Sequence, residues 1–185
     1  NDDVAAGLLI QRLPMAGGAN LAGEVLVSAD EDQIGRSEDY NRIALLAGTL
    51  TADELLAGLE NELRLLTDTD PAELDTTLLV HPLAMTDFLD FHFFLGEVDA
   101  LIRNLGYEGV FQIASLHPQY EFAGSEADDI ANFTNRSPYP TLHLLRESSI
   151  DRAVAAFPDA ADIFERNIET MERLGHEGWK KLWTS

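Results

Sequence analysis

The sequence contains no cysteine. Disulfides, thiolate zinc sites and thiol redox chemistry are therefore excluded, as is a small secreted fold held by disulfides. No apolar run approaches the roughly 20 residues that a membrane-spanning helix requires. The first ten residues, NDDVAAGLLI, also lack the basic flank and apolar core of a signal peptide. We therefore expect a soluble, cytoplasmic protein.

Positively charged residues are scarce. Only 12 lysines and arginines stand against 33 aspartates and glutamates, which gives a formal net charge of −21. Such a surface repels nucleic acids and anionic membranes, so we expect neither as a partner. The acidity is typical of a highly soluble protein, and an acidic face for a cationic partner is the alternative interpretation. The sequence does not indicate an oligomeric state.

The hydrophobic pattern predicts an α/β fold. With 185 residues, of which 45% are hydrophobic, the chain can form one ordinary domain or two small ones. Three apolar runs of strand length lie at about 76–81, 109–116 and 141–146, and crossover helices are expected between them. Further strands are expected in the N-terminal part, within residues 4–14 and 23–29.

Helices are expected on both sides of the first of these three strands. Apolar spacing predicts a helix over about residues 40–47, and Thr51 with Glu54 forms a capping box that begins a helix. Thr86 is expected to cap a long helix that ends at Gly106. The apolar stripe of this helix contains Phe88, Phe91, Leu95, Val98, Ile102 and Leu105.

Two of the predicted strands end in His-Pro. A strand, a crossover helix and a second strand form a parallel unit, and ligands gather beyond the carboxyl ends of such strands. His81 and His117 are then expected at the same edge of the sheet. The alternative is that His-Pro only ends each strand, because proline cannot donate a hydrogen bond to its neighbour.

Most of the side chains able to support chemistry lie between residues 111 and 147. We assign His117 as a general base or metal ligand and Arg136 as the residue that holds a small anionic ligand, with His143 nearby and Glu147 as a base or ligand. On a strand, His143 and Leu145 face one side, and Leu142, Leu144 and Arg146 the other. A helical 143–147 would instead place His143 and Glu147 at a metal-binding spacing. No metal or cofactor is assigned.

The same residues also allow a structural interpretation. Arg136 can form a salt bridge with Asp128 or Asp129, which would fix the long loop from residue 119 to residue 140. The two aspartates can cap a short helix or bind a hard cation. The sequence carries no known catalytic signature. Two functions therefore remain open. The first is a small enzyme or ligand-binding domain, and the second is a noncatalytic protein, either a chimeric or designed protein or an interaction module, whose polar residues brace the loop.

Three segments resemble a bacterial family that is known only as a domain of unknown function. They are TTLLVHP at 76–82, GVFQIASLHPQYEFAG at 109–124 and NFTNRSPYPTLHLLRES at 132–148. The resemblance starts near residue 60 and covers the rest of the chain. It implies no activity. The family usually opens with a segment that carries a Cys-Pro element, and this chain has a different segment in that place.

The first 58 residues resemble another family. AAGLLIQRLP at 5–14 and SEDYNRIALLAGTLTADELL at 37–56 are similar to the end of the N-terminal domain of the redox-regulated heat-shock holdase chaperone. The cysteine-rich zinc domain of that family is absent, so the resemblance implies a structural fragment without a redox switch. The two resemblances meet at about residues 58–62, inside a predicted helix. This suggests a chimera of a segment 1–58, not stable alone, and an α/β domain 59–185.

Overall fold

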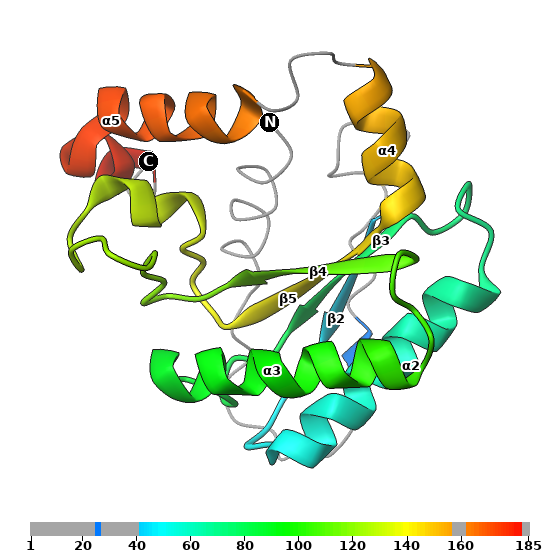
Figure 1. Cartoon of the computed structure of the whole chain (residues 1–185). Coiled ribbons are helices and arrows are strands. Elements are labelled where there is room, and N and C mark those ends of the chain that lie inside the picture. The colour runs from blue at the N-terminus through cyan, green and yellow to red at the C-terminus, as the bar shows by residue number, and fades with distance from the viewer. Residues whose placement is uncertain (1–24, 27–40, 157–161, 183–185) are drawn as a thin grey trace.

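The computed structural model describes residues 25–26, 41–156 and 162–182. The elements follow one another along the chain as drawn in Figure 1. They are β1 (Val25–Leu26), β2 (Asn41–Leu45), α2 (Ala52–Asp68), β3 (Thr76–Val80), α3 (Phe88–Asn104), β4 (Phe111–Leu116), the 3₁₀ helix η1 (Ile130–Thr134), β5 (Thr141–Arg146), α4 (Glu147–Ala156) and α5 (Asp162–Leu182). The α/β class and the three predicted strands of the second part are confirmed.

The strands of the described ranges form one mixed sheet with the order β1-β2-β3-β5-β4. β2 and β3 pair in parallel, and the other pairs are antiparallel. β5 is the last strand in the sequence, yet it lies between β3 and β4. The two strands that end in His-Pro are therefore parallel to each other but are separated by β5.

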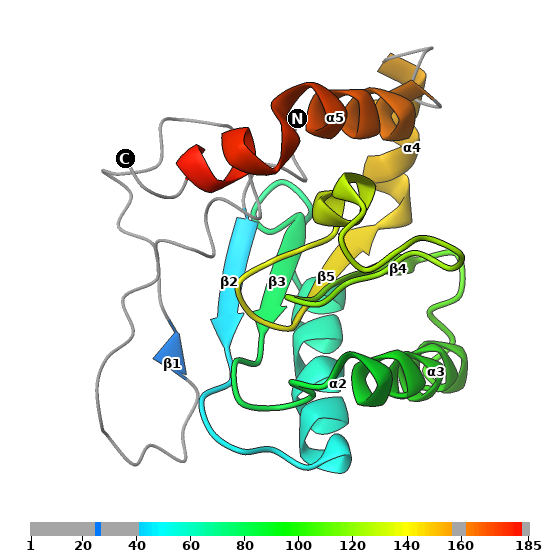
Figure 2. The same cartoon turned by 90° about the vertical axis from the view of Figure 1, so that its left-hand side faces the viewer.

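The main core lies between the sheet and the helices α2 and α3, which cover one of its faces (Figures 1 and 2). The strands contribute alternate residues to it, including Ala44, Leu79, Leu142 and Leu144, each of which is buried. The intervening strand residues face the opposite side, where Ile43, Leu78 and Val80 form a second buried cluster with Tyr139 and Leu45 against it. This alternation decides on which face each polar side chain of the sheet lies.

The predicted capping box at the start of α2 is confirmed. The amide of Glu54 donates to the hydroxyl of Thr51 at 3.3 Å, and the amide of Thr51 donates to the carboxylate of Glu54 at 2.8 Å. α3 ends as predicted at Gly106, whose φ of 72° is the left-handed conformation that glycine adopts readily. Its start differs from the prediction: the cap is Asp87, not Thr86, and it accepts bonds from the amides of Leu89 and Asp90.

The predicted helix over residues 40–47 is wrong, because Asn41–Leu45 forms strand β2. Each of its residues pairs with one of Thr76–Val80. A five-residue apolar run is too short for its periodicity to distinguish strand from helix, and here pairing with a distant segment decides. The strand expected within 23–29 contains β1, whereas the strand expected within 4–14 lies outside the described residues. No helix within the described ranges is long and apolar enough to cross a membrane.

Candidate functional site

His81 and His117 lie at the same edge of the sheet, as the two His-Pro strand ends predict. The amide of His81 donates to the carbonyl of Pro140 at 3.1 Å, just before β5 begins. The amide of His117 donates to the carbonyl of Asn135, also at 3.1 Å. Both imidazoles pack against Phe91 of α3, with ring centroids 5.9 Å away for His81 and 5.1 Å away for His117. The two histidines thus lie on either side of the start of β5, and both contact the ring of Phe91.

Both ring nitrogens of His117 form hydrogen bonds with the backbone. The amide of Gln119 donates to Nδ1 at 3.0 Å, so Nδ1 carries the lone pair and Nε2 carries the proton. Nε2 then donates to the carbonyl of Met85, 3.1 Å away. Burial of the side chain lowers the pKa of His117. The imidazole is therefore neutral at neutral pH, and its lone pair is engaged within the fold.

His81 is fully buried, and one of its ring nitrogens has no partner among the described residues. Its Nδ1 donates to the carbonyl of Ala84 at 3.0 Å, which leaves the lone pair on Nε2. Within the described part of the chain, that Nε2 has no hydrogen-bond partner. Burial, with a smaller contribution from nearby His117, lowers the pKa of His81 to about 4. His81 is thus a neutral buried ring with one unsatisfied acceptor.

The two histidines fix the turn that leads into α3. They donate to the carbonyls of the consecutive residues Ala84 and Met85. Met85 has a φ of 52°, in the left-handed region that a residue with a side chain seldom adopts. Asp87, the cap of α3, follows two residues later. Both histidines therefore have a structural role that accounts for their burial.

Arg136 holds the loop 119–140 together by donating to backbone carbonyls of the same loop. Its Nε donates to the carbonyl of Tyr120 at 3.1 Å, and one Nη donates to the carbonyl of Ala127 at 2.5 Å. The guanidinium also stacks over the ring of Phe133, 4.3 Å from its centroid. Arg136 thus braces the loop through two backbone carbonyls and an aromatic ring. The salt bridge expected with Asp128 or Asp129 is not among these contacts.

Asn132 is a second brace, and the sequence interpretation gave it no role. Its amide is fully buried. The side-chain oxygen accepts from the amide of Phe122 at 2.9 Å and from the hydroxyl of Ser125 at 2.8 Å, and Nδ2 donates to the carbonyl of Glu126 at 2.8 Å. The position of an asparagine in a turn-rich loop is the only signal that the sequence offers for it. Asp129 caps η1 as predicted, because it accepts from the amide of Ala131.

The structure does not bring His143 and Glu147 next to His117. His143 lies within β5 opposite Leu78, on the sheet face away from α2 and α3. Residues 143–146 are strand, so His143 and Glu147 do not take the helical metal-binding spacing. Glu147 begins α4, and its amide donates to the carbonyl of Val110 at 3.0 Å, at the end of β4 farthest from His117. His117, His143 and Glu147 thus lie in three separate places.

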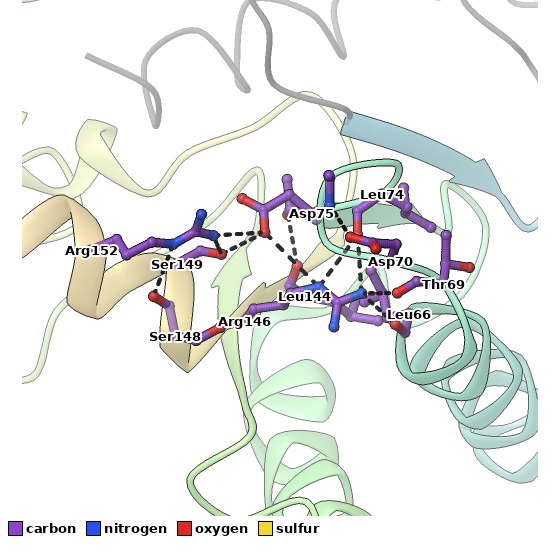
Figure 3. A network of polar contacts seen from close by, with 12 residues as sticks. Leu66, Thr69, Asp70, Leu74, Asp75, Leu144, Arg146, Ser148, Ser149 and Arg152 are labelled. Carbon is purple, nitrogen blue, oxygen red and sulfur yellow. Dashed lines mark hydrogen bonds and ion pairs between the residues drawn. The ribbon is translucent and has the colours of Figure 1, made fainter.

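Arg146 connects β5 to the end of α2, as Figure 3 shows. One Nη donates to the carbonyls of Leu66, Thr69 and Leu74, the last two at 3.0 Å. Asp75 lies 3.9 Å from Nε, at the outer limit of an ion pair. The last carbonyls of a helix lack intrahelical partners and carry partial negative charge, so a cation here is stabilising. Arg146 therefore caps the C-terminal end of α2.

Metal ligands do not cluster in the described residues. No group of three or more histidine, aspartate or glutamate side chains there is arranged to hold an ion. Of the aspartate pair considered for a hard cation, Asp129 uses its carboxylate to cap η1. The backbone carbonyl of Asp128 lies 2.7 Å from Nε2 of His176 on α5. Nε2 of His81 is a free nitrogen ligand, but a structural metal needs about four ligands.

Comparison with known proteins gives one match. A family model described as "Protein of unknown function (DUF1415)" matches residues 37–181. No curated protein and no solved structure matches the chain. The match begins upstream of β2, so it includes residues 37–58, which the sequence interpretation placed in the chaperone-like segment. The described fold from β2 to α5 lies within 37–182, almost the range that the family model covers.

Proposed function

The chain belongs to this family of unknown function, and from that premise we propose that it acts as a noncatalytic interaction module, a folded scaffold that binds another protein. One observation carries the proposal: the polar atoms of its best catalytic candidates are used inside the fold. His117 has both ring nitrogens in backbone hydrogen bonds, and Arg136 donates to two backbone carbonyls. The net charge of −21, which disfavours nucleic acids and anionic membranes, also supports a protein partner.

A small enzyme or a domain for a small anionic ligand is the second candidate. A general base needs a free lone pair within reach of substrate, and a guanidinium that clamps an anion needs free donors. His117 has no free lone pair, because its Nδ1 accepts from the amide of Gln119. Arg136 uses two of its five N–H donors to hold backbone carbonyls, which fixes the guanidinium inside the loop. One observation favours this candidate: Nε2 of His81 is buried and has no partner among the described residues. A ligand with a hydrogen-bond donor would satisfy it.

Thermal unfolding with added ligands distinguishes the two functions. Zinc, magnesium, phosphate and succinate serve as probes, because they represent the metal and anion chemistry first assigned to the site. A ligand at 100 times its dissociation constant stabilises a folded protein by about 2.7 kcal/mol, which raises the midpoint measurably. The interaction module predicts no rise with any probe. A rise that His81→Asn or Arg136→Lys abolishes would establish a ligand site and overturn the proposal.

A further inference from the structure

Helix α3 carries apolar residues on two sides. One side packs in the core through Phe91, Phe94, Val98 and Ile102, which are all buried. The opposite side carries a second row, Leu89, Phe93, Gly96 and Ala100, which we call the outer stripe. Its members are spaced by four, three and four residues, so they lie above one another along the helix. A helix that needed only to cover the sheet would have polar residues there.

Three of the four members of the outer stripe are exposed to solvent, and Ala100 is half-buried. Leu89 is 60% exposed and Phe93 is 68% exposed, the largest fraction among the large hydrophobic side chains described as exposed. A Cβ placed on Gly96 would meet no atom within 4 Å. Figures 1 and 2 show α3 at the outside of the fold, beside α2. Single exposed apolar side chains are ordinary, whereas a row at this spacing is the pattern through which helices pack on one another.

Acidic residues border the outer stripe. On a helix of 3.6 residues per turn, Asp90 and Glu97 lie along one border, and Asp99 lies along the other beside His92. The one lysine or arginine of α3 is Arg103, which is exposed in the last turn at the C-terminal end of the stripe. The acidic borders along the rest of the stripe therefore have no cation beside them on α3. A second copy of this chain would bring the same carboxylates against one another, and each copy carries a formal charge of −21. A partner with cationic flanks would instead gain from each of these charges.

We propose that the outer stripe is the docking face for a cationic amphipathic helix of another protein, one whose apolar row is flanked by lysine or arginine. Leu89 and Phe93 provide the apolar anchors. Gly96 has no side chain and Ala100 has only a methyl group, so the partner helix can approach closely at that end of the stripe. Asp90, Glu97 and Asp99 select the charge of the flanks. This inference rests on the proposed function and assigns it a surface and a class of partner.

Binding of two designed peptides to the full chain tests the proposal. Each peptide is a 20-residue helix with a leucine row; one carries lysine flanks and the other glutamate flanks. Fluorescence anisotropy at low ionic strength measures both affinities. The lysine peptide is expected to bind and to weaken as salt is added, since salt screens exposed charges. Equal binding of the two peptides, or no binding of the lysine peptide, overturns the proposal.

Variants locate the binding on α3. Leu89→Ser with Phe93→Ser removes both anchors and is expected to lower the affinity for the lysine peptide about tenfold or more. Asp90→Lys with Glu97→Lys is expected to reverse the preference, so that the glutamate peptide binds better. Val154→Ser on α4, 49% exposed in the wild type, is the matched control and should bind as the wild type does. Retained affinity in the Leu89/Phe93 variant contradicts the proposal.

Size-exclusion chromatography of extracts from producing cells separates failure of this inference from failure of the proposed function. If the wild type elutes in a complex with another protein and the Leu89/Phe93 variant does not, the proposed function and the α3 inference both stand. If both forms elute in the same complex, another surface binds the partner: the function stands and the α3 inference fails. If the wild type elutes as a free monomer, both fail. If the wild type forms a homodimer that the variant disrupts, the outer stripe binds a second copy of the chain, and the inference of a cationic partner fails.

Discussion

The guanidinium of Arg42 and the carboxylate of Glu62 form a two-bond ion pair. Nε donates to one carboxylate oxygen at 2.8 Å, and one Nη donates to the other at 3.0 Å. Arg42 lies on β2 and Glu62 on α2, where it is only 6% exposed. The parallel fork of arginine matches the carboxylate, which makes this geometry strong and directional. The pair fixes the position of α2 over β2.

Glu62→Gln is expected to destabilise the fold by about 1–3 kcal/mol, because it leaves a partly buried guanidinium without its counter-charge. Urea unfolding measures the change. Glu60→Gln is the matched control: the Arg64–Glu60 pair is the same kind of contact, but it is exposed, with 59% and 34% of the two side chains accessible. The control should change the free energy of unfolding by no more than about 1 kcal/mol. Equal losses of unfolding free energy in the two variants would show that the Arg42–Glu62 pair stabilises the fold no more than an exposed pair does.

The fragment 59–185 is expected not to unfold cooperatively. The division at residues 58 and 59, and with it the chimeric origin, stays a prediction. It falls inside α2, and it would remove β2, with its ladder to β3, and the buried Leu55. Loss of a strand and half a core helix exposes apolar surface on what remains. Limited proteolysis of the full chain provides the converse test: a resistant fragment beginning near residue 60 would support the division.

Acid is expected to destabilise the fold through His81. Burial lowers its pKa to about 4 from the ordinary value of 6.5. Below pH 6.5 the imidazole of the unfolded chain binds a proton that the folded chain does not, so the free energy of unfolding falls as the pH drops from about 6.5 and levels off near 4. The shift corresponds to a loss of about 3 kcal/mol. The lowered pKa of His117 acts in the same direction.

His81→Asn isolates this contribution, because the asparagine amide can still donate to Ala84 but does not titrate over this range. Both proteins contain the same carboxylates, so their other pH dependence cancels in the difference. The wild type should lose its advantage over the variant as the pH falls from 7 to 4, as measured by urea unfolding at each pH. Parallel curves for the two proteins would rule out His81 as the group responsible.

Arg136→Lys is expected to open the loop between β4 and β5. Lysine cannot reproduce the planar fork that reaches the carbonyls of Tyr120 and Ala127 while stacking on Phe133. The local opening free energy should fall by about 1–2 kcal/mol. Hydrogen exchange at the amide of Phe122 measures it, and Arg152→Lys on α4, with 69% of the arginine side chain exposed, is the control. Unchanged exchange at Phe122 would contradict the bracing role.

Gly96→Ala is expected to raise stability and weaken docking. The position is open, and alanine in a helix interior is more stable than glycine by about 0.5–1 kcal/mol. The added methyl group would hold a partner helix farther away, so the affinity for the lysine peptide should fall. Gly58→Ala is the contrasting variant, since its Cβ would lie 2.7 Å from Leu46 Cδ1 and offset the gain. A more stable Gly96→Ala protein that binds the peptide normally argues against close approach.

Much of the fold could be predicted from the sequence, because its apolar runs have clear limits. Pro82 and Pro118 end β3 and β4, and Gly106 ends α3. The alternation that places Leu144 in the core and His143 on the other face is also present in the sequence. β2 could not be predicted, because it is a strand only through its pairing with β3. The whole of α2 lies between the two in the sequence, and a local hydrophobic pattern carries no information about such distant pairing.

The candidate site was less predictable, because a sequence shows which polar groups exist but not which are already bonded. The partners of Arg136 and His117 are backbone carbonyls and amides, which every residue except proline carries in full. Nothing in the identities of Ala127 or Met85 indicates that either would accept a hydrogen bond. The sequence shows Leu89 and Phe93 at helical spacing, but the buried row from Phe91 to Ile102 has helical spacing too, so the spacing does not indicate which row is exposed.

The position of β5 has a consequence for the chain during its synthesis. Ribosomes add about 5–20 residues per second from the N-terminus, so β3 and β4 emerge before the strand that separates them. Until Arg146 is made, the facing edges of both strands stay unpaired, and the last carbonyls of α2, as many as 80 residues earlier, lack their donor. Unpaired edges invite pairing with other chains. A translational pause before residue 141 should therefore promote aggregation, and rapid completion should prevent it.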